Sequence, residues 1–222
     1  MTKNCIIPTK KKWILGLTGK YCAGKNHIAL LLEKRSIPVL DIDKLGHLVI
    51  ENEKERLLKR FGEEILDAQG LIDRRLLAGK VFGNPKELSD LEEIIHPEVN
   101  RKTIAWIEER EEEICVINAA LLHRSAIVDM LDVVIIIKAP FIVRLNRAIK
   151  RDRLPLVKLL KRFRSQKKFT SQIKSAIKSK FKEKKTDIYI VKNPASLNDQ
   201  DRRLENRIDE ILLFKQKRAL QE

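Results

Sequence analysis

The chain has 222 residues, of which 43% are hydrophobic and 35% are charged, so it can bury one sizeable core beneath a heavily ionised surface. No stretch approaches the roughly 18 apolar residues of a membrane span, and no apolar segment follows the basic residues near the start, so we expect a cytoplasmic protein that does not enter a membrane. Three widely spaced cysteines without a C-x-x-C motif indicate reduced thiols and disfavour a disulfide framework or a zinc site.

The net charge of +15 is concentrated in one segment. Residues 142–185 contain 17 lysines and arginines, and their only acidic residues are Asp152 and Glu183, so the rest of the chain is close to neutral. A local excess of this kind indicates an anionic partner, either the phosphates of a small molecule or a nucleic-acid backbone. A solvated basic helix without a ligand is an equally good interpretation of the charge alone.

Five short apolar runs predict β-strands, which begin near Trp13, Ile37, Ile114, Asp132 and Asp187. Their near-continuous Val, Ile and Leu content is typical of strands that are buried on both faces, and this favours a parallel sheet. Helical patterns separate the runs. The expected fold is therefore an α/β fold of three layers, with a five-stranded parallel sheet between helices.

The segment "GKYCAGKN" lies between the first strand and the next helical pattern and matches G-x-x-x-x-G-K. In this context the backbone N–H groups and the helix N-terminus form an anion cradle, and the lysine reaches the β and γ phosphates of a nucleotide. Lys20 and Tyr21 either contact phosphate or are exposed turn residues, and Cys22 is either a thiol of lowered pKa or a small buried residue. The predicted ATP-binding residues of this segment are Gly19, Lys20, Tyr21, Cys22, Ala23, Gly24, Lys25 and Asn26.

Magnesium is the expected cofactor, although Asn26 occupies the place where this motif normally has the hydroxyl of Ser or Thr. The Asn carbonyl is also a hard oxygen, so we expect a weakened magnesium site. Asp41 and Asp43 follow the second strand and would point to the same side of an extended chain. One can accept a proton from an attacking hydroxyl while the other orients magnesium-bound water; the alternative is a helix N-cap and a solvated carboxylate. Asn26 and Asp41 are the candidate metal ligands.

Two connections between strands are long. Residues 46–113 read as a helical insertion, and residues 142–185 read as two helices in a basic hairpin, with Pro155 in the first turn of the second helix. The last segment spaces four apolar residues on one helical face and predicts a closing amphipathic helix. These four residues are Leu204, Ile208, Ile211 and Leu212.

The sequence resembles the dephospho-CoA kinase family over nearly its whole length. The resemblance includes "GLTGKYCAGK", "VLDIDKLGHLVI", "LNRAIKRD", "RFRSQ" and "DIYIVKNP". Its most specific part is the order "FGEEILDAQGLIDRRLLAGKVF" followed by "LEEIIHP", which other P-loop kinases do not share. The resemblance implies a P-loop NTPase-type fold with a helical substrate-binding insertion and a basic helical lid.

The resemblance also implies an activity: transfer of the γ-phosphate of ATP to the ribose 3′-hydroxyl of dephospho-CoA, which gives CoA and ADP in the last step of CoA biosynthesis. ATP and dephospho-CoA are the implied partners. Lys25, Asp43 and Arg147 match catalytic positions, with Asp43 as the base, and Arg151 matches an ATP-binding position of the lid. Arg162 and Gln166 match the R-x-x-x-Q of the lid. The implied substrate-binding residues are Thr18, Asp43, Arg74, Arg147 and Arg162.

The resemblance implies a single kinase domain over residues 1–222, in which the insertion binds the CoA substrate. Arg147 and Arg151 are four residues apart and share one helix face, so both guanidinium groups can reach the transferring phosphoryl group. The expected parts are a core of residues 13–45, 114–141 and 186–218, an insertion of residues 46–113, and a lid of residues 142–185.

Departures from the family pattern cluster around the expected reaction centre. After the third strand, Asn118, Ala120, His123 and Arg124 replace the Asp, Pro, Phe and Glu that the family usually has. An alternative function is therefore a catalytically impaired relative that binds nucleotide or, less favoured, nucleic acid through the basic hairpin. In that case removal of the charges at three lysines should weaken nucleic-acid binding. These are Lys174, Lys178 and Lys180.

Overall fold

The computed structural model describes residues 12–166, 169–180, 186–194 and 200–219. Its centre is a five-stranded sheet in the order β2-β3-β1-β4-β5, and every strand pair is parallel, so the predicted fold class is confirmed. The strands are β1 (Trp13–Gly19), β2 (Val39–Asp41), β3 (Ile114–Asn118), β4 (Val133–Lys138) and β5 (Asp187–Lys192).

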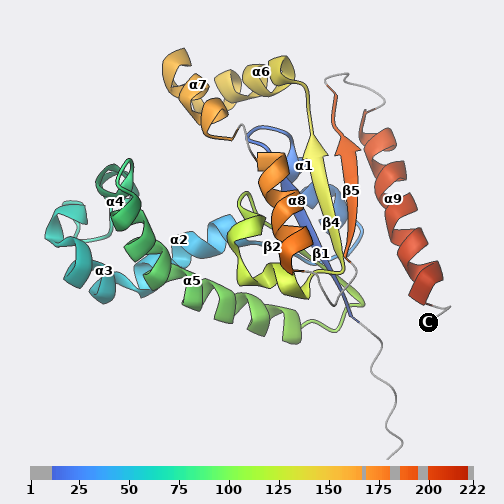
Figure 1. The fold of residues 1–222 in the computed structure, drawn as a ribbon, viewed down its shortest axis with the longest axis horizontal. Helices are drawn as coiled ribbons and strands as arrows, with labels where there is room; N and C mark the ends of the chain where they lie inside the picture. The colour runs from blue at the N-terminus through green and yellow to red at the C-terminus, as the bar shows by residue number, and fades with distance from the viewer. Residues whose placement is uncertain (1–11, 167–168, 181–185, 195–199, 220–222) are drawn as a thin grey trace, which may run out of the picture.

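Helices cover both faces of the sheet, because side chains at alternate positions of each strand point to opposite faces. On one face, α1 (Lys25–Glu33) and α9 (Gln200–Ala219) pack against Leu15 and Leu17 of β1. On the other face, α8 (Phe169–Lys180) packs against β4 (Figure 1). Of the four apolar residues expected on one face of the last helix, Leu204, Ile208 and Ile211 are buried, and Leu212 packs partly buried beside them.

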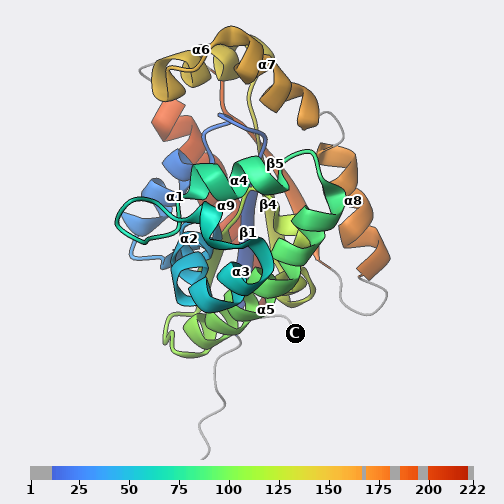
Figure 2. The ribbon, with the colours of Figure 1, turned by 90° about the vertical axis from the view of Figure 1, so that its left-hand side faces the viewer.

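Four helices between β2 and β3 form a group with an apolar core of its own, beside the sheet (Figures 1 and 2). Phe61 and Leu57 lie at the centre of this core and are almost fully buried. The chain enters directly from β2 and returns through the longest helix. The four helices are α2 (Ile42–Asn52), α3 (Lys54–Phe61), α4 (Arg74–Val81) and α5 (Pro85–Glu108).

The expected basic hairpin of two helices is wrong in one respect, because the described residues of this segment form three helices. They are α6 (Phe141–Asp152), α7 (Leu156–Ser165) and α8, and Pro155 is the N-cap of α7. Helices α6 and α7 lie beyond the carboxyl ends of the strands, whereas α8 lies along the sheet (Figure 1). Phe169 and Ile173 of α8 are one helical turn apart and both bury against the sheet, which draws this helix away from the hairpin.

The second strand is shorter than the sequence suggests. It ends at Asp41, and Asp43 lies in the first turn of α2, because the Asp41 carboxylate accepts a hydrogen bond from the N–H of Lys44 and caps this helix. The expectation that Asp41 and Asp43 share one side of an extended chain is therefore wrong. Within the described ranges, no helix combines the length and the apolar character that a membrane crossing requires.

The separate core of α2–α5 gives a stability prediction. Phe61 is 1% exposed and Phe82 is 86% exposed, so the two phenylalanines form a matched pair. We expect Phe61→Ala to lower the free energy of unfolding by about 3–5 kcal/mol, because it leaves a cavity in a packed core. Phe82→Ala should change it by about 0.5 kcal/mol or less. Urea unfolding followed by circular dichroism measures both, and equal losses in the two variants would contradict this account of the core.

Candidate active site

The glycine-rich turn after β1 encloses a cavity of about 260 Å³. Gly24 has a φ of 97°, and a side-chain carbon at this position would lie 2.0 Å from Nδ2 of Asn193, so only glycine fits here. Helix α1 begins at the next residue, and its N-terminus therefore faces the cavity. All eight predicted residues of the turn line this cavity together with Asp43, Ala120, Arg151 and Gln166.

Asp43 lies at the edge of this cavity and has two partners. Nζ of Lys25 donates to its carboxylate at 2.8 Å, and the N–H of Ala120 donates to both carboxylate oxygens at 3.3 Å. A proline at position 120 would have no N–H to donate. The sequence difference at Ala120 therefore adds a hydrogen bond that orients this carboxylate.

Three oxygen-bearing side chains meet where β1, β2 and β3 end. Nδ2 of Asn118 lies 3.4 Å from Oδ1 of Asn26 and 3.5 Å from Oδ2 of Asp41, and donates to both. Oδ1 of Asn118 is buried and has no hydrogen-bond partner. Hard oxygens of this kind fit magnesium, which also takes ligands from nucleotide phosphates and water. Among the described residues, no group of three or more His, Cys, Asp and Glu side chains could hold a metal ion.

The first residues of the turn connect to the lid helices through Tyr21. Its hydroxyl donates to the carboxylate of Asp152, and its N–H donates to Oε1 of Gln166 at 2.6 Å. Asp152 also accepts from Nε of Arg151 at 2.6 Å and from Nη1 of Arg162 at 3.1 Å. The ring of Tyr21 packs edge-on against Phe163 of α7 with 5.3 Å between ring centres. Asp152 thus holds two predicted ligand-binding arginines beside the cavity.

The remaining predicted site residues lie at different distances from the cavity. Thr18 is fully buried at the end of β1, and its hydroxyl donates to the carbonyl of Ala120 at 3.4 Å. Arg147 does not line the cavity; it donates to the carbonyl of Ala23 at 3.3 Å and to Oδ1 of Asn193 at 3.1 Å. Arg74 is exposed at the start of α4 and does not line the cavity either. The side chains of Arg124, Lys174, Lys178 and Lys180 lie outside what the structure describes.

Burial raises the pKa of the Cys22 thiol, and four nearby arginines only partly oppose this rise. The interpretation of Cys22 as a thiol of lowered pKa is therefore wrong, and the interpretation as a small, partly buried residue fits the structure. Cys115 lies in the core, and burial raises its pKa to about 11. Neither thiol is primed to act as a nucleophile.

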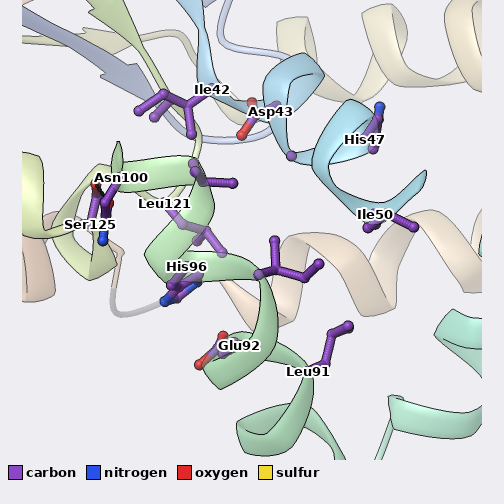
Figure 3. A pocket seen from close by; sticks show the side chains of 14 residues that line it. Ile42, Asp43, His47, Ile50, Leu91, Glu92, His96, Asn100, Leu121 and Ser125 are labelled. Atoms are coloured by element: carbon purple, nitrogen blue, oxygen red, sulfur yellow. Dashed lines mark hydrogen bonds between the residues drawn. The ribbon is translucent and has the colours of Figure 1, made fainter. Parts of the chain in front are cut away.

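A second, apolar cavity of about 270 Å³ opens on the other side of Asp43, and the sequence reasoning missed it. Figure 3 shows Asp43 and His47 from α2 on one wall and His96 and Asn100 from α5 on another. The cavity forms where α2, α5 and residues that follow β3, such as Ala119 and Leu121, pack together, so no local pattern predicts it. Asp43 lines both cavities.

Two polar residues that support the loop were also missed. Nδ2 of Asn193 donates to the carbonyl of Ala23 at 2.9 Å, and Asp152 joins the lid arginines to Tyr21. A usable signal existed for Asn193, because it directly follows a predicted parallel strand, where side chains reach the ligand edge of the sheet.

Comparison with known proteins decides the family. The sequence model of the dephospho-CoA kinase family matches residues 13–197. The chain belongs to this family. A curated dephospho-CoA kinase of Thermus thermophilus is 31% identical over 198 residues, which cover 89% of this chain and 91% of the relative. One of Borrelia garinii subsp. bavariensis is 36% identical over 135 residues, which cover 60% of this chain and 66% of the relative.

A crystal structure of a Thermus thermophilus protein is similar to this chain with a TM-score of 0.75 and 29% sequence identity, and the match covers 92% of this chain and 98% of that one. We call the Gly19–Asn26 turn, which lies inside the segment that the family model matches, the phosphate loop. This phosphate loop keeps the lysine of the family motif. Departures from the family pattern lie at Asn26 in the loop, at Asn118 at the end of β3, and at Ala120 beyond it.

Cys22 offers a test of nucleotide binding that does not depend on turnover. Because its thiol lines the phosphate-loop cavity, we expect ADP with Mg²⁺ to slow its reaction with maleimide, by about tenfold at ten times the dissociation constant. Mass spectrometry of a Cys5→Ser variant measures the labelling, because Cys5 lies outside the described residues. Cys115 should react only after unfolding, since it is fully buried. Labelling of Cys22 at the same rate with and without ADP would contradict the placement of the nucleotide.

Proposed function

We propose that this protein transfers the γ-phosphate of ATP to the ribose 3′-hydroxyl of dephospho-CoA and releases CoA and ADP, as the last step of CoA biosynthesis. Membership of the dephospho-CoA kinase family supports the proposal. The structural observation that carries it is the position of Asp43, whose side chain lines both the phosphate-loop cavity and the apolar cavity. A carboxylate between a phosphate donor and an organic acceptor is where phosphoryl transfer needs its base.

In the proposed reaction, Asp43 accepts the proton of the 3′-hydroxyl while the ribose oxygen forms a bond to the γ-phosphorus. The bond between that phosphorus and the oxygen it shares with the β-phosphate breaks, and ADP leaves. Lys25, which pairs with Asp43 at 2.8 Å in the structure, turns to the β and γ phosphates when ATP binds. This exchange frees Asp43 to act as a base, while the N–H of Ala120 keeps its carboxylate in place.

The oxygen cluster at the strand ends is the proposed magnesium site. Oδ1 of Asn26, Oδ2 of Asp41 and the unpartnered Oδ1 of Asn118 would face the ion, directly or through water. A bound magnesium ion supplies charge neutralisation between the β and γ phosphates. Asp41 keeps its other oxygen on the N–H of Lys44, so capping α2 and facing the ion are compatible roles.

We assign the dephospho-CoA acceptor to the apolar cavity. Ile42, Ile95 and Leu121 supply apolar walls, and His96 and Asn100 supply polar edges suited to the adenosine part of the acceptor. On this assignment the α2–α5 helices form the substrate-binding insertion. Arg74 would then contact the acceptor only where it extends beyond this cavity.

The lid arginines complete the proposed mechanism. Arg151 lines the phosphate-loop cavity, and Arg162 shares the carboxylate of Asp152 with it. Both would exchange this carboxylate for phosphate oxygens, which makes the lid close around ATP. Arg147 would hold the loop in position through its hydrogen bond to the carbonyl of Ala23.

A direct assay tests the proposal. Purified protein with ATP, Mg²⁺ and dephospho-CoA should form ADP and CoA in equal amounts, and Lys25→Ala should remove most of this activity. Asp43→Asn should lower kcat by about 10²–10⁴-fold, because general base catalysis contributes this much, while ADP binding by calorimetry persists. If the wild type turns over no faster than Lys25→Ala at any concentration of Mg²⁺ or Mn²⁺, the proposed kinase activity is refuted.

The oxygen cluster gives a separate prediction about metal binding. Asn26→Ser should lower the Mg²⁺ concentration needed for half-maximal rate, because a hydroxyl on the β-carbon restores the usual ligand of this motif. Mn²⁺ binding in the presence of ADP, followed by electron paramagnetic resonance, should tighten in parallel. Asn52→Ser, an exposed change at the end of α2, is the matched control and should alter neither. Unchanged metal binding in Asn26→Ser would show that Asn26 does not face the ion.

A further inference from the structure

A cationic cavity lies beside the phosphate loop, on the face of the sheet that α8 covers. Its volume is about 260 Å³, and its lining includes Lys20 of the loop, Lys138 at the end of β4, Arg144 of α6, and Phe169 and Thr170 of α8. Three of the lining residues are positively charged and none is negatively charged. The three positive charges repel one another unless an anion lies between them.

Arg144 is the most constrained of the three cations. It is 9% exposed, its Nε is buried without a hydrogen-bond partner, and Nη1 has a long hydrogen bond of 3.5 Å to the carbonyl of Tyr21. Its guanidinium otherwise lies over the rings of Phe141 and Phe163, at 6.0 and 5.0 Å from their centres. A buried charge without an ionic partner is costly, so this guanidinium is suited to a ligand that brings a negative charge.

Lys20 and Lys138 add two further charges without compensation. Neither has an ion pair with any residue in the part of the chain that the structure describes. The pKa of Lys20 is lowered, first by burial and then by the positive charges of Arg144 and Lys138, which places the three groups within electrostatic reach of one another. The cations on the other side of the loop differ, because Lys25, Arg151 and Arg162 each pair with a carboxylate.

We propose that this cavity binds a phosphate group that does not belong to ATP. Two ammonium groups, a guanidinium and the Thr170 hydroxyl offer the donors that phosphate oxygens accept. Lys20 lines both this cavity and the phosphate-loop cavity, so the two anion sites adjoin each other around one side chain.

Two ligands carry this chemistry. The first is the 5′-diphosphate of the acceptor. This assignment rests on the proposed function, because it requires dephospho-CoA to bind beside Asp43. The second is a free phosphate or pyrophosphate ion, which does not depend on that function. We favour the acceptor diphosphate, since Lys20 of this cavity also lines the phosphate-loop cavity, whose lining contains Asp43.

Calorimetry on the full chain, with the phosphate loop saturated by a non-hydrolysable ATP analogue and Mg²⁺, tests the site. Titrants are pyrophosphate, dephospho-CoA and adenosine. Lys138→Ala should weaken the binding of a diphosphate ligand about tenfold, as expected for the loss of one charge-assisted hydrogen bond, and Lys138→Arg should retain it. Lys192→Ala is the matched control, because Lys192 is exposed and pairs with Lys138 in register on β5 but does not line the cavity.

Each outcome decides a different point. Weaker dephospho-CoA binding in Lys138→Ala, with adenosine binding unchanged, supports the acceptor diphosphate as the ligand. Weaker pyrophosphate binding alone supports a free anion. The site is refuted if pyrophosphate and dephospho-CoA bind Lys138→Ala as tightly as they bind Lys192→Ala. It is also refuted if neither of these two ligands binds the wild type. If the protein shows no turnover but its binding of pyrophosphate depends on Lys138, the kinase function is refuted and the anion site is supported.

Discussion

The parallel register of three adjacent strands, β2, β3 and β1, is the constraint on which the site depends. Leu17 of β1 pairs with Asn118 of β3, and Asn118 pairs with Asp41 of β2, so all three strands end at one edge of the sheet. The phosphate loop leaves β1 two residues further on, and α2 leaves β2 directly. Because the edge is shared, the loop, the oxygen cluster and Asp43 come together although about 100 residues separate the loop from Asn118.

Carboxylates within the protein occupy the places that phosphates would take around the loop. Lys25 pairs with Asp43, and Arg151 and Arg162 share Asp152, so these cations are compensated without a nucleotide. In the proposed mechanism, ATP would displace each of these carboxylates, and each displacement would prepare a catalytic part: a free base in one case and free lid arginines in the other. The cations at the Lys20 side of the loop have no such carboxylates among the residues that the structure describes, which distinguishes that side.

The sequence predicts those parts of the molecule that depend on local pattern. Continuous apolar runs predicted all five strands, because burial on both faces of the sheet requires apolar residues at successive positions. The spacing of glycines and Lys25 predicted the phosphate loop, because the tight turn into α1 requires glycine. The position of α8 as a separate helix on the sheet was not predicted. Its apolar face consists of Phe169 and Ile173, and these two residues lie in a segment whose composition is otherwise dominated by basic residues. The apolar cavity and the raised pKa of Cys22 depend on tertiary packing, which no local pattern encodes.

The two amides near the expected magnesium ion are best understood as a coupled pair. An aspartate at position 118, as the family usually has, would place a carboxylate oxygen against the Asn26 carbonyl, and the two acceptors would repel each other unless the Asn26 amide turned or a cation lay between them. Asn118 instead donates to Asn26 and Asp41, so two hydrogen bonds join the three side chains. The same exchange removes one negative charge and turns the remaining acceptor, Oδ1 of Asn118, into a buried oxygen without a partner. The amide pair therefore lowers the attraction for a cation while keeping the oxygens that can bind one.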